Sequence, residues 1–303
     1  MTKFLLDSGD PDEYRTISAL AKEKGSQLWG GTTNPSLIAK KLTGTKVSSR
    51  QEAFQLQKDI VLHILDIVPG AVSAEVYADQ NTKAEEMIEQ GKDIATWHER
   101  IYVKLPTTLE GLKARSELRK NKIPINNTLV FSQQQVFAIC LHEKLCQKEC
   151  GPIENEWPPF ISPFVGRLDD IGENGMELVK NGMELKETVG TPMWMLEASV
   201  RSPEHLKEGI DSGTEIITSP GKIYEEWFHL SNEEQANLDT QKYQENLANK
   251  PLWEVPENLL TIDSLDAFFK AIESGELDIT HELTDKGITR FADDWNAIIT
   301  PSK

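Results

Sequence analysis

The sequence has 303 residues, and its 32 Lys and Arg residues against 49 Asp and Glu residues give a formal net charge of −17. This excess of acid disfavours a nucleic-acid-binding protein, and no apolar run approaches the roughly 18 residues of a membrane-spanning helix. We therefore expect no nucleic-acid or membrane partner, and an anionic ligand would need cations placed locally.

The N-terminal segment carries an acid, Asp7, where a signal peptide would continue its apolar stretch, which predicts a cytoplasmic protein. Beyond it, short apolar segments rich in β-branched residues alternate with amphipathic helical segments, as in a parallel sheet with crossover helices. The expected strands are residues 4–7, 28–34, 71–76, 101–105, 123–130, 160–165, 193–199 and 215–218. Eight strand–helix units predict an α/β fold, a (β/α)8 barrel of the TIM type with additional C-terminal helices.

We expect residues 1–303 to form a single domain with its barrel core in residues 1–230. Residues 231–260 are polar and rich in Glu, Gln and Asn without an alternating pattern, and they predict an arm. Residues 261–303 carry apolar residues at helical spacing, so they predict helices that pack on the barrel.

The three cysteines, Cys140, Cys146 and Cys150, lie in one short segment around His142. Their odd number does not suggest a disulfide framework, and no CxxC spacing is present, so we expect reduced thiols and no metal site. The sequence also lacks the GxGxxG and GxxxxGK[ST] phosphate loops. We therefore expect no cofactor.

Side chains alternate along a strand, and barrel enzymes place their chemistry on inward residues at the C-terminal strand ends. Applied to the expected strands, this parity predicts that polar and aromatic side chains from seven strands converge. They are Asp7, Thr32, Asn34, Ser73, Glu75, Tyr102, Lys104, Asn126, Thr128, Ser162, Phe164, Glu197 and Ser199.

Lys104 is the most informative of these residues, because it lies at the end of an apolar strand just before Pro106. In an interior strand the lysine has little access to solvent, and burial favours the neutral amine, which is the nucleophilic form. A lysine that reaches the surface from the strand end is the alternative. Asp7 and Glu75 would supply acid and base groups to a Schiff-base lysine, although each alone would also fit a helix cap or an ion pair.

Four sequence blocks, in order along the chain, match those of a known enzyme family. They are TTNPSLI at 32–38, VKLPT at 103–107 with EGL at 110–112, NNTLVFS at 126–132, and ISPFVGR at 161–167 with DD at 169–170. On these blocks the sequence resembles the transaldolases, over residues 4–227 and again in a final helix around residues 283–298. The block around Lys104 matches the segment that carries the Schiff-base lysine of that family.

The resemblance implies a class I transaldolase of the pentose phosphate pathway, which needs no metal. It would move a dihydroxyacetone unit from sedoheptulose 7-phosphate to glyceraldehyde 3-phosphate, giving erythrose 4-phosphate and fructose 6-phosphate. Lys104 would attack the ketose carbonyl, Glu75 and Thr128 would handle a water, and Asp7 would take the proton whose loss cleaves the C3–C4 bond.

The resemblance also implies a set of substrate-binding residues, with phosphorylated sugars as the partners. Asn34 and Asn126 would bind substrate hydroxyls. Arg167, Ser199 and Arg201 match the phosphate-binding positions, although each arginine taken alone would be interpreted as a surface ion pair. The expected substrate site therefore comprises Thr32, Asn34, Asn126, Ser162, Phe164, Arg167, Ser199 and Arg201.

Two other functions stay open on the sequence, a lyase and a non-catalytic barrel. The related fructose-6-phosphate aldolases tend to carry Gln and Tyr where this chain has Glu75 and Phe164, so the transferase is preferred. The presence of Lys104, Asp7 and Glu75 argues against a barrel that only binds or scaffolds.

Some features depart from the family pattern. Glu197 stands where the family usually has a small residue. It lies two residues before Ser199, so the two side chains are expected to point to the same side of the strand, which predicts a carboxylate near the phosphate site. The connection at residues 141–159 is longer than usual and suits either a loop over the barrel rim or an oligomer contact. A homo-oligomer is compatible with the sequence.

Overall fold

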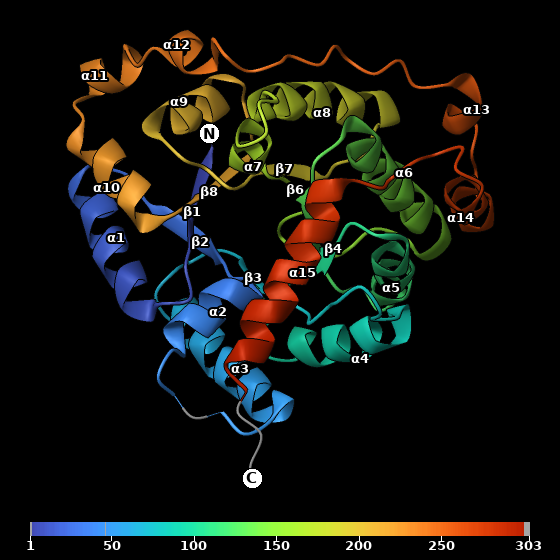
Figure 1. The fold of residues 1–303 in the computed structure, drawn as a ribbon, viewed down its shortest axis with the longest axis horizontal. Helices are drawn as coiled ribbons and strands as arrows, with labels where there is room; N and C mark the ends of the chain where they lie inside the picture. Colours follow the sequence, from blue (N-terminus) through green and yellow to red (C-terminus); the bar gives the residue numbers. More distant parts are fainter. Residues whose placement is uncertain (1, 46, 300–303) are drawn as a thin grey trace.

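The computed structural model describes residues 2–45 and 47–299. Within them, eight parallel strands pair in chain order and the last pairs with the first, which closes a barrel (Figure 1). The strands are β1 (Lys3–Asp7), β2 (Leu28–Thr32), β3 (Val72–Glu75), β4 (Ile101–Pro106), β5 (Ile125–Val130), β6 (Phe160–Pro163), β7 (Trp194–Glu197) and β8 (Ile216–Ser219). This confirms the predicted (β/α)8 barrel.

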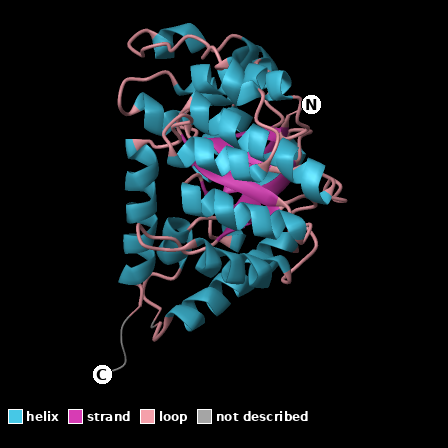
Figure 2. Ribbon diagram, turned by 90° about the vertical axis from the view of Figure 1, so that its right-hand side faces the viewer, coloured by secondary structure: helices cyan, strands magenta, loops and turns pink. Residues whose placement is uncertain are grey.

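Helices surround the strands on the outside (Figure 2). They are α1 (Pro11–Glu23), α2 (Pro35–Lys41), α3 (Arg50–Leu65), α4 (Ala84–Ala95), α5 (Leu109–Lys120), α6 (Gln133–Cys150), α7 (Val165–Asp169), α8 (Gly175–Val189), α9 (Pro203–Asp211), α10 (Gly221–His229), α11 (Asn232–Ala236), α12 (Thr240–Gln244), α13 (Glu257–Leu260), α14 (Leu265–Glu273) and α15 (Glu282–Ala297). None of these helices in the described ranges is long and apolar enough to cross a bilayer.

Three strands end two residues earlier than predicted, because a turn or helix begins there. Asn34 does not extend β2; its side chain accepts a hydrogen bond from Leu37 N at 3.0 Å and so caps α2. Phe164 lies at the start of α7 rather than in β6. After β7, Ser199 adopts a φ of 61°, which turns the chain away from the extended direction.

Aromatic side chains fill the N-terminal end of the barrel, where the strands begin. Tyr102 and Phe160 stack with their ring centres 4.2 Å apart, and Trp29 and Trp157 meet edge to face at 4.6 Å. The Tyr102 hydroxyl donates to the backbone carbonyl of Trp157. The long connection before β6 therefore covers this end of the barrel, and the barrel interior is closed there.

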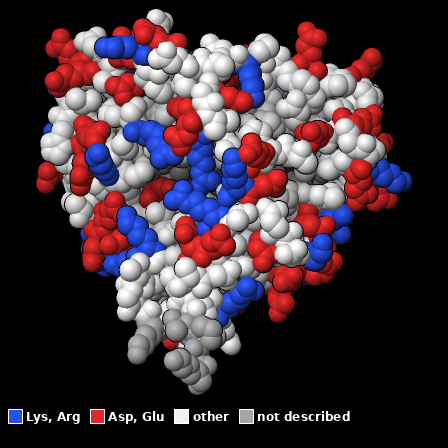
Figure 3. Space-filling model, viewed as in Figure 1, with Lys and Arg blue, Asp and Glu red and all other residues white. Residues whose placement is uncertain are grey.

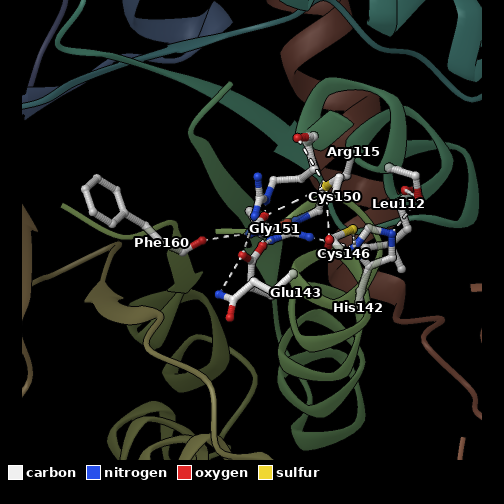
Figure 4. Close-up of polar contacts among 12 residues, drawn as sticks. Leu112, Arg115, His142, Glu143, Cys146, Cys150, Gly151 and Phe160 are labelled. Carbon is white, nitrogen blue, oxygen red and sulfur yellow. Dashed lines mark hydrogen bonds and ion pairs between the residues drawn. The ribbon is translucent and has the colours of Figure 1, made fainter. Parts of the chain in front are cut away.

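A buried ionic cluster lies outside the barrel, between α5 and α6 (Figure 4). Arg119 binds Glu143 through two hydrogen bonds, from Nε at 2.8 Å and from Nη2 at 2.7 Å, and Arg115 binds the same carboxylate. The pKa of Glu143 is lowered to about 2, because the charges of Arg115 and Arg119 and their hydrogen bonds outweigh the effect of burial.

His142, which lies among the cysteines in the sequence, belongs to this cluster. Its Nδ1 lies 2.6 Å from Arg115 Nη1 and its Nε2 lies 2.7 Å from Ser116 Oγ, so both ring nitrogens have partners. Burial, followed by the Arg115 charge, lowers the pKa of His142 well below its usual value. Burial also raises the pKa of Cys140 and of Cys146 to about 12, which keeps both thiols protonated and unreactive.

The last long helix, α15, crosses the C-terminal end of the barrel (Figure 1). The hydroxyl of Thr284 donates to the carbonyl of Leu129 at 2.9 Å, which ties the start of α15 to β5. Farther along, Asp294 accepts a hydrogen bond from Ser36 at the start of α2. The helix therefore covers the C-terminal end of the barrel.

Candidate active site

A cavity of about 250 Å³ opens at the C-terminal strand ends beneath α15. Nine of the residues predicted from the sequence line it, and they come from five strand ends and the segments that follow them. They are Asp7, Thr32, Asn34, Lys104, Ser162, Phe164, Arg167, Ser199 and Arg201. This is the end at which barrel enzymes carry their chemistry.

Lys104 is buried in this cavity, and its side chain is only 4% exposed. Its Nζ lies 3.1 Å from Glu75 Oε2 and 3.3 Å from the carbonyl oxygen of Thr33. Lys104 and Glu75 are direct partners across the β3–β4 pairing, so both side chains point into the barrel. The sheet register therefore places a carboxyl group beside the amine.

The carboxyl group of Glu75 is buried against this amine. Burial raises the pKa of Glu75, while the Lys104 charge opposes the shift without reversing it. A carboxyl group with a raised pKa keeps its proton to a higher pH than an exposed glutamic acid does. Glu75 is thus suited to give and take a proton at a group attached to Lys104.

Asp7 lies on the cavity wall from β1. Its Oδ1 accepts a hydrogen bond from Thr32 Oγ1 at 2.7 Å, and Thr32 Oγ1 also lies 2.6 Å from Thr218 Oγ1. Burial raises the pKa of Asp7, although the Lys104 charge and the Thr32 hydrogen bond act against the shift. A raised pKa makes the ionised carboxylate a stronger base than an exposed aspartate.

Two predicted residues on β5, Asn126 and Thr128, are not among the residues that line the cavity. Asn126 donates to Ser73 Oγ at 3.0 Å and accepts from Ser162 Oγ at 2.6 Å, so it links β3, β5 and β6. The hydroxyl of Thr128 is buried without a hydrogen-bond partner among the described residues. Glu75 is likewise not among the lining residues and reaches the cavity through Lys104.

Arginines gather at one end of the cavity. The guanidinium carbon of Arg167 lies 5.3 Å from the ring centre of Phe164 and 5.4 Å from that of Phe291 on α15, so the two phenyl rings flank it. Burial, followed by the charges of Arg290 and Arg201, lowers the pKa of Arg167. Such mutual repulsion is relieved by a bound anion.

Arg201 lies on the turn that follows β7, with its side chain half exposed. Its Nη2 lies 2.9 Å from Asp170 Oδ2, and the backbone of Ser199 accepts a hydrogen bond from Gly166 N at 3.1 Å. A Cβ atom on Gly166 would lie 2.3 Å from the Ser199 carbonyl oxygen, so only glycine fits there. This close approach of the two turns brings Arg167 and Arg201 to the same end of the cavity.

Arg290 and Phe291 line the cavity from α15 and were missed by the sequence reasoning. The strand-parity argument covers strand residues only, and the four matching blocks end before α15. An arginine next to an apolar residue on an amphipathic helix was the available signal, but it does not indicate which surface the helix covers.

The prediction for Glu197 was wrong, because Glu197 points away from the cavity. Leu196 and Ala198 face the cavity, while Glu197 is fully buried behind β7 against α9. A Cβ atom on Gly209 of α9 would lie 1.9 Å from Glu197 Oε2. Burial, followed by the charges of Glu208 and Asp169, raises the pKa of Glu197 well above its usual value.

The surface charge agrees with an anion site at this end of the barrel. The chain as a whole carries −17 charges. Figure 3 nevertheless shows Lys and Arg side chains gathered around a hollow at the centre of the face that α15 crosses. Lys104, Arg167, Arg201 and Arg290 line the cavity, with Asp7 as its carboxylate. The cavity therefore combines a buried amine, nearby acid and base groups, and cations for an anionic substrate.

The chain is similar to one known protein family over most of its length. Residues 4–301 match the family model described as "Transaldolase/Fructose-6-phosphate aldolase". A "Probable transaldolase" of Chlorobium limicola is 37% identical over 246 residues, which cover 81% of this chain and 98% of that protein. Another "Probable transaldolase", from Lactiplantibacillus plantarum, is 32% identical over 301 residues, covering 99% of this chain and 100% of its own length.

Proposed function

This chain belongs to the transaldolase/fructose-6-phosphate aldolase family, and on that premise we propose that it is a transaldolase acting through a Schiff base on Lys104. It transfers a dihydroxyacetone unit from sedoheptulose 7-phosphate to glyceraldehyde 3-phosphate, a reaction of the pentose phosphate pathway. The observation that carries the proposal is the pair of Lys104 Nζ and Glu75 Oε2, 3.1 Å apart at a cavity that Asp7 and three arginines line.

The first stage forms the imine. Nζ of Lys104, after losing a proton, attacks the ketose carbonyl carbon, and the carbinolamine loses its hydroxyl group as water. Glu75, beside Nζ and with a raised pKa, delivers the proton that the departing hydroxyl needs. The buried hydroxyl of Thr128 supports the proposal that a water is held between these groups.

The second stage breaks and remakes a carbon–carbon bond. Asp7 takes the proton of the C4 hydroxyl, the C3–C4 bond breaks, and its electron pair enters the imine to form an enamine while the aldehyde leaves. Adding the acceptor aldehyde reverses these steps, and water then releases the ketose from Lys104. Burial and the Thr32 hydrogen bond keep Asp7 in place as the base.

Phosphate recognition belongs to the arginine end of the cavity. Arg167 and Arg201 bind the phosphate with the backbone and hydroxyl of Ser199, and Arg290 adds a third cation from α15. Guanidinium groups bind phosphate oxygens in pairs, which orients the sugar chain toward Lys104. Asn34 and Ser162 also line the cavity and are the proposed partners of the sugar hydroxyls.

The test combines a transfer assay with a borohydride trapping experiment. The purified chain receives fructose 6-phosphate and erythrose 4-phosphate, and sedoheptulose 7-phosphate is measured as the product. Borohydride with fructose 6-phosphate should label the peptide that contains Lys104, and Lys104→Ala should lose both the label and the transfer. Lys113→Ala, which changes a surface lysine, is the matched control. Rapid release of free dihydroxyacetone without an acceptor would instead identify a lyase.

A further inference from the structure

The arm at residues 231–260 contacts the barrel next to the arginine end of the cavity. In Figure 1 it runs along the outside of α9 and α8 before it reaches α13. Backbone hydrogen bonds fasten its middle: Ala248 N donates to Gly172 O at 2.8 Å, and Asn174 N donates to Ala248 O at 3.0 Å. These bonds hold the arm to the α7–α8 link.

One arm side chain, Tyr243 of α12, reaches inward from this attachment. Its hydroxyl donates to Asp169 Oδ2 at 2.9 Å. Its ring packs edge to face against the ring of His205, with the ring centres 4.6 Å apart. His205 is fully buried, and its Nε2 lies 2.8 Å from the same carboxylate oxygen of Asp169.

Asp169 and His205 are joined to the two phosphate-site arginines. Asp169 is the last residue of α7, two positions after Arg167, and its Oδ1 accepts from Gly175 N at 2.9 Å. The backbone N–H of Arg201 donates to His205 Nδ1 at 3.0 Å. Because a backbone N–H can only donate, Nδ1 is the unprotonated nitrogen, so Nε2 carries the proton of the neutral ring and faces both Asp169 Oδ2 and the Tyr243 hydroxyl.

The two arginines need to be held in place, because their guanidinium groups carry like charges. Arg167 lies on α7 and Arg201 on the turn after β7, and the Arg201 charge contributes to lowering the pKa of Arg167, so the two guanidinium groups repel each other. Two cations bind one phosphate well only at a fixed spacing. The Asp169 carboxylate connects the turn that carries one arginine to the backbone of the other.

We propose that Tyr243 is a positioning residue for phosphate recognition, because its hydroxyl fixes the Asp169 carboxylate that ties Arg167 on α7 to His205 and the Arg201 backbone. The arm thus sets the geometry of the phosphate site from outside the cavity. This inference rests on the proposed transaldolase activity and extends it to a residue that touches no substrate.

The experiment compares Tyr243→Phe, which removes the hydroxyl and keeps the ring, with Gln241→Ala, an exposed position on the same short helix. Tyr243→Phe should raise KM for fructose 6-phosphate and erythrose 4-phosphate by about three- to tenfold, the range expected for one lost hydrogen bond. It should leave kcat within about twofold and leave KM for unphosphorylated erythrose unchanged. The inhibition constant of inorganic phosphate should rise in parallel, and Gln241→Ala should match the unmodified enzyme.

A double-mutant cycle tests the route through Asp169. Asp169→Asn and Tyr243→Phe should each raise KM for phosphorylated substrates, and the double variant should lose less than the product of the two effects. Independent effects that multiply would overturn the proposed route. Equal losses with phosphorylated and unphosphorylated substrates, or a loss confined to kcat, would show that Tyr243 serves the fold alone.

The same measurements separate this inference from the proposed function. An unmodified enzyme that transfers no dihydroxyacetone unit removes the proposed function and this inference with it. An active enzyme in which Tyr243→Phe leaves every KM and the phosphate inhibition constant unchanged overturns this inference alone.

Discussion

Nζ of Lys104 and Oε2 of Glu75 lie 3.1 Å apart inside the barrel, and each side chain is only 4% exposed. The contact follows from the sheet register, because these two residues are direct partners between β3 and β4. A buried lysine without a partner would lower the free energy of unfolding, and the pairing with Glu75 reduces that loss. The arrangement is therefore best understood through the chemistry it supports.

The first prediction tests the proton role of Glu75. Glu75→Gln keeps the size of the side chain but removes its acid–base capacity, so kcat for transfer should fall by about 10²- to 10⁴-fold. Single-turnover borohydride trapping should show slower imine formation on Lys104, with little change in KM for fructose 6-phosphate. Imine formation at the unmodified rate would assign the proton transfer to another group.

A second prediction concerns the acid limb of the pH profile. Asp7 must lose its proton to act as the base, and burial raises its pKa. As the pH is lowered, kcat/KM should therefore begin to fall at a higher pH than the range in which an exposed aspartate takes up its proton. Thr32→Val removes a hydrogen bond that favours the carboxylate, so the acid limb should move to higher pH.

Thr33→Val provides the control for that experiment. The Thr33 hydroxyl donates to the carbonyl of Ser73, not to Asp7, so the control should leave the acid limb in place. A limb that stays unmoved in Thr32→Val as well would show that another group governs it.

The sequence predicted the barrel and most of the cavity wall because side-chain alternation holds in regular strands. Asp7, Glu75 and Lys104 lie in the described parts of β1, β3 and β4, and each points inward as the parity requires. The same rule failed for Glu197, because it was counted together with Ser199, beyond the end of β7, where a φ of 61° breaks the alternation. Parity is therefore reliable only up to the residue at which the strand ends.

The remaining site residues depend on how distant segments dock, which local patterns do not specify. Arg290 reaches the cavity because α15 lies across the barrel, and Tyr243 reaches Asp169 because the arm is fastened beside α7. In the sequence, both residues fall on the polar side of a helical pattern, where an ordinary solvent-exposed residue would also fall. Only the tertiary arrangement distinguishes them from their neighbours.

A third prediction tests the cation that α15 contributes. Arg290→Ala should raise KM for phosphorylated substrates by about tenfold, on the order of 1.4 kcal/mol for a charge-assisted contact, and Arg167→Ala should do so at least as strongly. Lys286→Ala is the matched control, because it removes one positive charge from the same helix at an exposed residue paired with Glu282. Equal KM increases in Arg290→Ala and Lys286→Ala would show that only the overall field is involved.

A fourth prediction concerns stability at low pH, through the cluster in Figure 4. Glu143 has a pKa of about 2 in the folded chain against an ordinary value of 4.5, so its contribution is complete above about pH 4.5 and is lost as the pH falls through about 2. Glu143→Gln leaves two buried guanidinium groups without a counter-charge and should lower the free energy of unfolding at pH 7 by about 3–5 kcal/mol.

Urea unfolding at several pH values checks this prediction. The difference between the unmodified chain and Glu143→Gln should shrink as the pH falls from about 4.5 toward 2, because the unfolded chain takes up a proton on Glu143 in this range while the folded chain still holds the carboxylate ionised. A difference that stays constant over this range would show that packing, not the charge of Glu143, sets the loss.

The last prediction concerns reaction type and rests on Phe164. Its ring lies 5.9 Å from Lys104 Nζ and also flanks Arg167, so it borders both the proposed imine and the proposed phosphate site. A phenyl ring offers no proton, so the enamine on Lys104 should persist until an aldehyde acceptor arrives, and cleavage of fructose 6-phosphate alone should be slow. Phe164→Tyr adds a hydroxyl that can deliver a proton to the enamine carbon, directly or through a water. The variant should therefore release more free dihydroxyacetone, with less sedoheptulose 7-phosphate formed per turnover when erythrose 4-phosphate is present.

Both products are measured with and without acceptor, and Phe164→Leu serves as the control because it changes the ring without adding a hydroxyl. If Phe164→Leu releases as much dihydroxyacetone as Phe164→Tyr, water entering a loosened site protonates the enamine, and the transferase outcome depends on the packing of residue 164, not on its lack of a proton.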